Sequence, residues 1–195
     1  PSMNIGRFWR TVKHLNFDQW RYRLIRRGWL LIAGLAPNLW RRRLEYFSQR
    51  IPIADPTRPQ LKTIADQVLV LQTAVHGKWL QEMTQGQFTF FSVKVDFGGI
   101  DDVDWSRHVN AENGLLWRLN LGYMGYVVPW LASGKTIDLD RTSDLVRGLS
   151  GKSLWLLPGV FNDIWNPYTV SHRIVNLLAG LNLFSRAGGD MGSAG

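Results

Sequence analysis

Six residues in the second half of the chain have the side-chain types that bind a sugar. They are Asn120, Tyr123, Trp165, Tyr168, His172 and Arg173. Tryptophan and tyrosine offer ring faces with a polar edge, an amide exchanges hydrogen bonds with hydroxyl groups, and a guanidinium pairs with a carboxylate. One interpretation is that this set lines one concave surface and binds an acidic sugar.

The spacing places these residues on two predicted helices. Asn120 and Tyr123 are three residues apart and share one helix face, as do His172 and Asn176, which are four apart. Tyr168 lies at a predicted helix start, where backbone N–H groups and the helix dipole favour an anionic group.

A purely structural interpretation fits the same residue types. Asn120 is then a satisfied core amide, and His172 belongs to an ordinary solvated face. Trp165 and Tyr168 would hold the helix entry in place, and Arg173 would pair with an acidic residue inside the fold. The spacing alone does not decide between the two interpretations.

Metal chemistry is not expected. The chain has no cysteine, which excludes disulfides and thiolate metal sites. The only imidazoles are those of His14, His76, His108 and His172, and no two of them have the helical spacing of a zinc site. We predict neither a metal site nor a cofactor.

The elements that must position these side chains are mostly helical. Apolar periodicity predicts helices over 8–27, 29–47 with Pro37 near an interruption, 61–79, 115–132 with a possible kink at Pro129, and 142–149. A last helix should begin at Asn166–Pro167, with an apolar stripe of Val170, Ile174, Leu177, Leu178, Leu181 and Phe184. The aromatic, β-branched run Phe88–Phe97 ends at two glycines, as a short strand or hairpin does.

Composition and charge divide the chain into four segments. Residues 1–50 hold eleven basic and two acidic residues, a net charge of +9, whereas the remaining 145 sum to −1. We predict a basic helical segment over 1–50, a proline-rich linker over 51–60, a helical domain over 61–186 and a flexible tail over 187–195. The expected class is mainly α with a small β element.

The basic segment suits an anionic partner. An acidic polysaccharide is the expected one, and peripheral membrane contact through residues 7–50 is a second possibility. Nucleic acid is not expected, because nothing beyond charge supports it. The apolar run Trp29–Pro37 is too short for a membrane span of ~20 residues and lacks the order of a signal peptide. A cytoplasmic location is expected, with a periplasmic one as the alternative.

The order of several motifs resembles a known family. A phenylalanine-rich "FTFF…VDF" run is followed by Asp104–Trp105, then "LLWRLNLGYMGYV", then "WNPYTVSHRIVNLL". This order is similar to the N-terminal domain of the heparinase II/III-like polysaccharide lyases, which shows an LWRYNLHYFDYL-type helix and a W-x-PY-x-xS-x-RIVN helix. The opening "RFWRTVKHL" also resembles members found with bacterial exopolysaccharide genes.

The resemblance implies a fold and an activity. The chain would form part of an (α/α) toroid, truncated relative to the family, and the whole enzyme would cleave an acidic, uronate-containing polysaccharide by β-elimination. In that reaction a neutralised carboxylate acidifies the proton at C5, a base removes it, and an acid protonates the leaving oxygen. The asparagine that neutralises the carboxylate lies in a GNHLL-like motif, which residues 1–195 do not contain. We therefore expect no catalytic residue in this chain and no activity from it alone.

The chain also departs from the family pattern. Gly122, Met124 and Gly125 stand where the family commonly shows His, Phe and Asp. A different substrate or a non-catalytic member would account for this. The alternatives to a lyase portion are thus a non-catalytic polysaccharide-binding module of an exopolysaccharide system, and a basic binder of membrane surfaces or nucleic acid.

Overall fold

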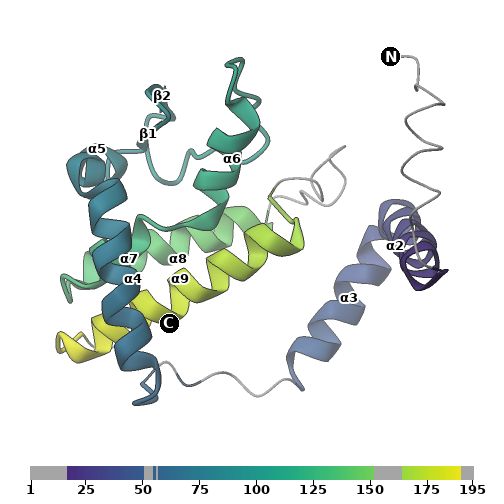
Figure 1. The fold of residues 1–195 in the computed structure, drawn as a ribbon, viewed down its shortest axis with the longest axis horizontal. Coiled ribbons are helices and arrows are strands. Elements are labelled where there is room, and N and C mark those ends of the chain that lie inside the picture. The colour runs from purple at the N-terminus through teal and green to yellow at the C-terminus, as the bar shows by residue number, and fades with distance from the viewer. Residues whose placement is uncertain (1–16, 51–54, 56, 152–163, 190–195) are drawn as a thin grey trace. The chain divides into compact units, whose positions relative to one another are not determined.

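The structure, a computed structural model, describes residues 17–50, 55, 57–151 and 164–189. The chain divides into two compact units, Pro1–Pro52 and Ile53–Gly195, which are described separately (Figure 1). The described residues are mainly helical and include one small antiparallel sheet, which confirms the predicted class at that level.

The first unit contains α2 (Phe17–Leu35) and α3 (Pro37–Ser48). The prediction that one helix ends near Arg27 and the next begins at Trp29 is wrong, because α2 continues through Gly28. An interior glycine costs a helix only about 1 kcal/mol. The break falls at Pro37, whose ring disfavours helical backbone in the residue before it, and Pro37 then opens α3. Residues 8–16 of the predicted first helix lie outside the described residues.

The second unit begins with a helical stretch of three elements. They are α4 (Leu61–His76), the 3₁₀ turn η1 (Gly77–Trp79) and α5 (Leu80–Met83). The predicted helix over 61–79 is confirmed, with its last turn tightened. Most of the predicted linker, 51–54 and residue 56, lies outside the described residues.

The predicted β element is a hairpin with a two-residue turn. Strand β1 (Gln87–Phe90) pairs antiparallel with β2 (Val93–Asp96), with Phe88 opposite Val95. Both turn residues have left-handed backbone, with φ of 51° at Phe91 and 62° at Ser92. Such a turn matches the twist of the two strands, but it usually contains Asn and Gly because a side chain is strained there. The surrounding unit therefore holds this turn against local preference.

The predicted long helix over 115–132 is two helices. Helix α6 (Gly114–Tyr123) ends at Met124, whose φ of 54° is left-handed, and α7 (Val127–Leu131) follows. The kink expected at Pro129 is wrong. Pro129 lies in the first turn of α7, where a backbone N–H has no helical partner to lose.

Two longer helices complete the unit. Helix α8 (Thr136–Gly151) is longer than the predicted 142–149, and α9 (Pro167–Arg186) begins where predicted. The Asn166 side chain caps α9 by accepting a hydrogen bond from the Tyr168 backbone N–H at 2.9 Å. Helix α9 packs against α4, α6 and α7, so it is the central helix of this unit (Figure 1).

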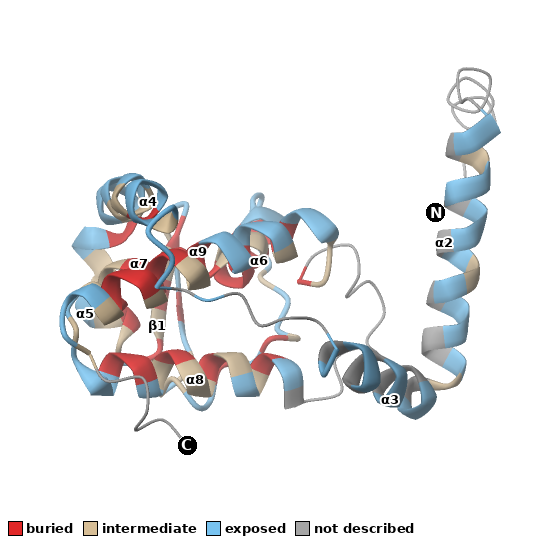
Figure 2. Ribbon diagram, turned by 90° about the horizontal axis from the view of Figure 1, so that it is seen from below, coloured by how far each residue is buried: buried red, intermediate tan, exposed pale blue. Residues whose placement is uncertain are grey.

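The face that α9 buries matches the predicted apolar stripe only in part: Phe184 is buried, and Leu177 and Leu181 pack against the core. Ile174 is 52% exposed, whereas Thr169, Arg173, Asn176 and Leu183 are buried (Figure 2). Small residues also occupy this face, including Gly180, where a Cβ would lie 2.7 Å from the Leu131 side chain. Close packing against α7 and hydrogen bonding to α6 therefore determine the orientation of α9.

Aromatic rings form the main core of the second unit. Phe88 and Phe90 of the hairpin contact Tyr126, and Phe90 also contacts Trp117 at a centroid distance of 5.2 Å. The Trp117 indole N–H donates to the Val93 carbonyl at 2.9 Å, which ties α6 to the sheet. Trp117 is buried, as we expect for most tryptophans.

No helix within the described ranges combines the length and the hydropathy that crossing a bilayer requires. Of the predicted tail, residues 187–189 are described and 190–195 lie outside the described residues.

Candidate functional site

The two family-like helices meet where α6 ends. The Arg173 Nε donates to the Gly122 carbonyl at 2.8 Å, and the Asn176 amide donates to the Tyr123 carbonyl at 2.8 Å. Carbonyls in the last turn of a helix have no partner within the helix. Side chains of α9 therefore cap the C-terminus of α6 and hold the left-handed turn at Met124 in place.

Arg173 is buried, and it lines none of the three cavities found among the described residues. It is only 6% exposed, and its second nitrogen, Nη2, donates to the Ile164 carbonyl at 2.8 Å. Its guanidinium carbon lies 5.3 Å from the centroid of the Trp165 ring, a cation–π contact. Burial lowers the pKa of Arg173 to about 10. Among the described residues its hydrogen-bond partners are backbone carbonyls and not the carboxylate that the structural interpretation expects.

Three of the six predicted residues form an aromatic cluster. Tyr168 and His172 lie 4.4 Å apart between ring centroids, and Tyr123 lies 4.9 Å from His172 and 6.0 Å from Tyr168. Burial raises the pKa of Tyr123, and the neighbouring Tyr168 raises it further. Because Tyr168 is 62% exposed, this cluster presents ring edges and a hydroxyl at the surface.

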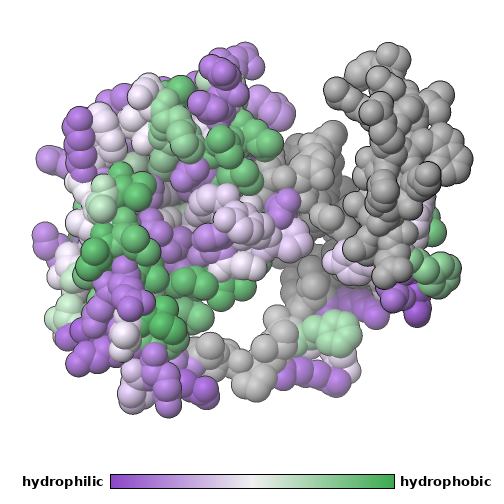
Figure 3. All heavy atoms as spheres, viewed as in Figure 1, coloured by the Kyte–Doolittle hydropathy of each residue, from purple (hydrophilic) through white to green (hydrophobic). Residues whose placement is uncertain are grey.

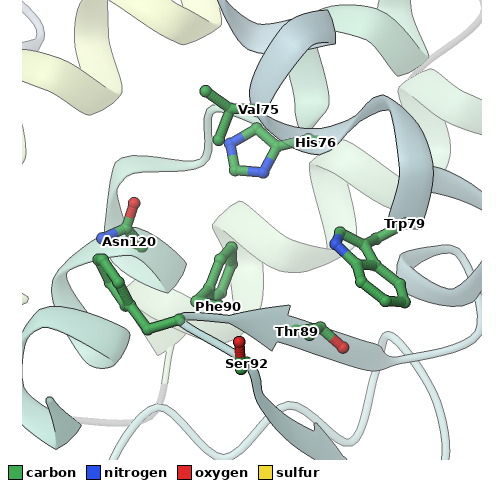
Figure 4. A pocket seen from close by; sticks show the side chains of 8 residues that line it. Val75, His76, Trp79, Thr89, Phe90, Ser92 and Asn120 are labelled. Atoms are coloured by element: carbon green, nitrogen blue, oxygen red, sulfur yellow. The ribbon is translucent and has the colours of Figure 1, made fainter.

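Asn120 lies apart from that cluster and lines a cavity of about 290 Å³ (Figure 4). The other lining residues are Val75, His76, Trp79, Thr89, Phe90, Phe91 and Ser92. They come from the end of α4, from η1, and from β1 with its turn. The Asn120 amide nitrogen donates to the Leu116 carbonyl at 2.9 Å, so the side chain is held by its own helix.

His76 is the titratable group of this cavity. It is 4% exposed, and burial lowers the pKa of its imidazole to about 4. Its ring packs edge-on against Phe90 and Tyr126, at centroid distances of 5.9 and 6.1 Å. At neutral pH the ring is thus uncharged, with one nitrogen that donates and one that accepts.

The hydroxyl groups of Thr89 and Ser92 add to the polar lining. The Thr89 Oγ1 atom is buried and forms no hydrogen bond with any described residue. A buried hydroxyl without a partner is uncommon, since leaving it unsatisfied costs about 1–3 kcal/mol. A ligand hydroxyl or a water in the cavity would satisfy it.

The lining of this cavity determines what it can hold. Trp79, Phe90 and Phe91 give it an apolar wall, while His76, Asn120 and Ser92 provide uncharged polar groups. None of the described residues that line it carries a charge at neutral pH. The arrangement suits an uncharged, hydroxyl-rich group with an apolar face, such as the ring of a sugar.

Two other cavities of the second unit are less suited to a polar ligand. One of about 360 Å³ between α8 and α9 is lined mainly by apolar residues, among them Leu139, Val146 and Leu177. The other, of about 310 Å³, contains Asp138, whose carboxylate already pairs with Arg141 at 2.8 Å.

Sequence reasoning missed most of the cavity lining. It considered His76 only as a metal ligand and Trp79 only as part of an apolar stripe. One sequence signal could have indicated the cavity. His76 and Trp79 lie at the end of a predicted helix, a few residues before the predicted hairpin that contains Ser92. Among the described residues, no cluster of His, Cys, Asp and Glu could hold a metal ion.

Comparisons with family models, curated proteins and solved structures found no match to this chain.

Proposed function

We propose that this chain is the helical portion of a heparinase II/III-like polysaccharide lyase and that the cavity beside Asn120 holds one uncharged sugar unit of an acidic exopolysaccharide. The observation that carries the proposal is the cavity lining, with Trp79 and Phe91 on its apolar wall and His76 and Asn120 among its polar groups. A sugar ring has an apolar face and a rim of hydroxyls, so both kinds of group find a partner.

The contact between α6 and α9 supports the family resemblance. The LWRLNLGYMGY stretch and the SHRIVN stretch are far apart in sequence, yet Arg173 and Asn176 of the second cap the helix formed by the first. This gives a physical reason for the two motifs to occur together. Arg173 acts in this proposal as a positioning residue for α6, which carries Asn120 and Tyr123.

Unpaired apolar faces support the proposed (α/α) toroid. On α4 the side chains of Ile64, Leu71 and Val75 are 49%, 65% and 62% exposed, and Figure 3 shows hydrophobic residues gathered along this helix. In a toroid each helix packs on neighbours on both sides, and further helices would cover such a face.

We assign binding, and not cleavage, to residues 1–195. β-Elimination needs a group that neutralises the uronate carboxylate, a base and an acid. Among the described residues no charged group lines the cavity, and the buried Arg173 already donates to two carbonyls. The proposed lyase would take its catalytic groups from elsewhere.

A non-catalytic polysaccharide-binding module is the second candidate function, and it is favoured by two glycines, one in the last turn of α6 and one between α6 and α7. A Cβ at Gly122 would lie 3.0 Å from the Thr169 side chain, and one at Gly125 would lie 2.9 Å from the His76 Nε2 atom. The family commonly has histidine and aspartate at these two positions. Here close packing replaces any side chain that could contact the sugar.

Binding of uronate oligosaccharides to the full chain, followed by calorimetry, tests the proposal. Loss of the Asn120 hydrogen bond in Asn120→Ala should weaken binding about three- to tenfold, and Trp79→Ala should weaken it more, because it removes the apolar wall. Asn110→Ala is the matched control, since Asn110 is exposed and does not line the cavity.

Two outcomes would contradict the proposal. Equal affinity of the original chain and the Trp79→Ala variant would exclude the cavity as the sugar site. Formation of the unsaturated-uronate absorbance by the chain alone would show that catalytic groups lie within it. Activity of the full-length parent protein, if it carries a GNHLL-like segment, separates a lyase from a binding module.

A further inference from the structure

The helix α2 exposes an apolar stripe along its whole length. Phe17, Leu24, Leu31 and Leu35 follow one another at spacings of seven, seven and four residues, so they share one face. Their side chains are 80%, 60%, 66% and 85% exposed. A stripe of this kind usually packs against a core.

Helix α3 exposes aromatic and basic residues together. Tyr46 and Phe47 are about half exposed, and Leu39 is 66% exposed. The Arg50 guanidinium lies 4.0 Å from the Tyr46 ring centroid, and that of Arg43 lies 5.4 Å from the Trp29 ring of α2. Arginines stacked on aromatic rings at a surface suit an interface between water and an apolar phase.

The charge of these helices has one sign. Residues 17–50 hold eight arginines and two carboxylates, a net charge of +6. Within the described residues, no carboxylate pairs with Arg42 or Arg43, and both are exposed. Because both side chains are exposed, an external anionic partner can reach them.

We propose that α2 and α3 bind the surface of an anionic lipid bilayer, with the apolar stripe of α2 inserted among the acyl chains and the arginines at the phosphate level. A large apolar face, Trp and Phe on that side and a basic polar face are the properties of helices that lie in a membrane interface. Long arginine side chains reach back to the headgroups from partly inserted positions. This proposal is independent of the sugar-binding proposal.

The exposed leucines favour a lipid surface over a soluble polyanion. A polysaccharide or a nucleic acid would neutralise the arginines but would leave Leu31 and Leu35 in water. A bilayer satisfies both kinds of residue at once. The two partners therefore predict different effects of removing apolar side chains.

Cosedimentation of the full chain with vesicles tests this. Vesicles of phosphatidylcholine containing phosphatidylserine should bind the chain, and pure phosphatidylcholine vesicles should bind it far less. The double variant Leu31→Gln, Leu35→Gln keeps the charge and the helix propensity, and it should weaken vesicle binding on the order of a hundredfold. Leu71→Gln is the matched control, because Leu71 is 65% exposed on a helix of the other unit.

The arginines are tested separately. Arg42→Ser with Arg43→Ser should weaken binding to anionic vesicles about ten- to thirtyfold, and added salt should shrink that difference. Circular dichroism of each variant checks that it keeps its helix content. The proposal is overturned if the chain ignores anionic vesicles, or if Leu31→Gln, Leu35→Gln binds them as well as the original chain. Equal loss in the leucine variant and the Leu71→Gln control also overturns it.

Discussion

The two units of this chain place apolar and polar side chains in opposite ways. In the second unit Trp117, Phe88 and Tyr126 fill a core, and even the polar residues Arg173 and Asn176 are buried. In the first unit Leu24, Leu31 and Leu35 of α2 are largely exposed, on a helix that also carries arginines. Apolar burial is the main source of stability in the second unit, whereas none of the described side chains of α2 and α3 is buried.

This difference shows what each unit depends on. The packed unit holds strained backbone at Phe91, Ser92 and Met124, because surrounding contacts over-determine those positions. The α2–α3 unit contains no such position among its described residues. Its described residues are helical without strained backbone, and the exposed apolar stripe of α2 indicates a binding partner.

The largest effect should come from removing the buried guanidinium. Arg173→Ala deletes two charge-assisted hydrogen bonds, to Gly122 and Ile164, and should lower the free energy of unfolding by about 3 kcal/mol or more. Urea denaturation measures it. The control is Arg186→Ala on the same helix, whose ion pair with Asp66 is exposed and should contribute less than about 1 kcal/mol.

The same variant separates a structural role of Arg173 from a sugar contact. If Arg173 only positions α6, the folded fraction of Arg173→Ala binds oligosaccharide close to normally. Unchanged stability combined with lost affinity would show that Arg173 contacts the ligand. It would also show that this buried residue does not stabilise the packed unit.

The next effect is a pH dependence confined to the packed unit. Burial lowers the pKa of His76 from 6.5 to about 4, so the unfolded chain takes up a proton before the folded chain does. Stability from this group is therefore complete above pH 6.5 and is lost as the pH falls towards 4, by about 3 kcal/mol.

Unfolding free energies measured between pH 4 and 7 test this expectation. The variant His76→Gln should show a shallower fall over that range, and the difference between the two curves removes the contribution of carboxylates. Parallel curves would mean that the His76 ring is accessible to solvent in the folded state.

The smallest effect should come from the first unit. Leu31→Gln should change the free energy of unfolding by less than about 0.5 kcal/mol, because Leu31 is 66% exposed and glutamine is as good a helix former. Thermal denaturation followed by circular dichroism measures it. A loss of 2 kcal/mol or more would show that the stripe of α2 is packed within the chain, which would remove the contrast between the units.

Local patterns predicted much of this fold. The Asn166–Pro167 helix start, the helix from Leu61 and the β element at Phe88–Phe97 are all present. Each of these depends on neighbouring residues: a cap and a proline, a regular apolar repeat, and an aromatic run ending in glycines. Such features are visible in a sequence because their causes lie within a few residues.

The errors have long-range causes. The α6–α7 break requires the left-handed Met124 and the close approach of Gly125 to His76, which no local pattern shows. Long-range contacts also explain why the six predicted site residues do not lie on one surface. Asn120 and Tyr123 share a helix. Asn120 lines a cavity together with the residues of the hairpin turn, whereas Tyr123 contacts His172 of α9. The position of Arg173 depends on carbonyls supplied by other elements.

The capping of α6 by α9 also has a consequence for the order of folding. Two hydrogen bonds complete the end of α6. One spans 51 positions of the sequence and the other spans 53, so both require closure of a long loop. Helix α6 can nucleate early from its own residues, but its last turn gains its side-chain caps only after α9 docks. We therefore expect that, during synthesis on the ribosome, the turn between α6 and α7 reaches its native form only after Arg173 and Asn176 have emerged.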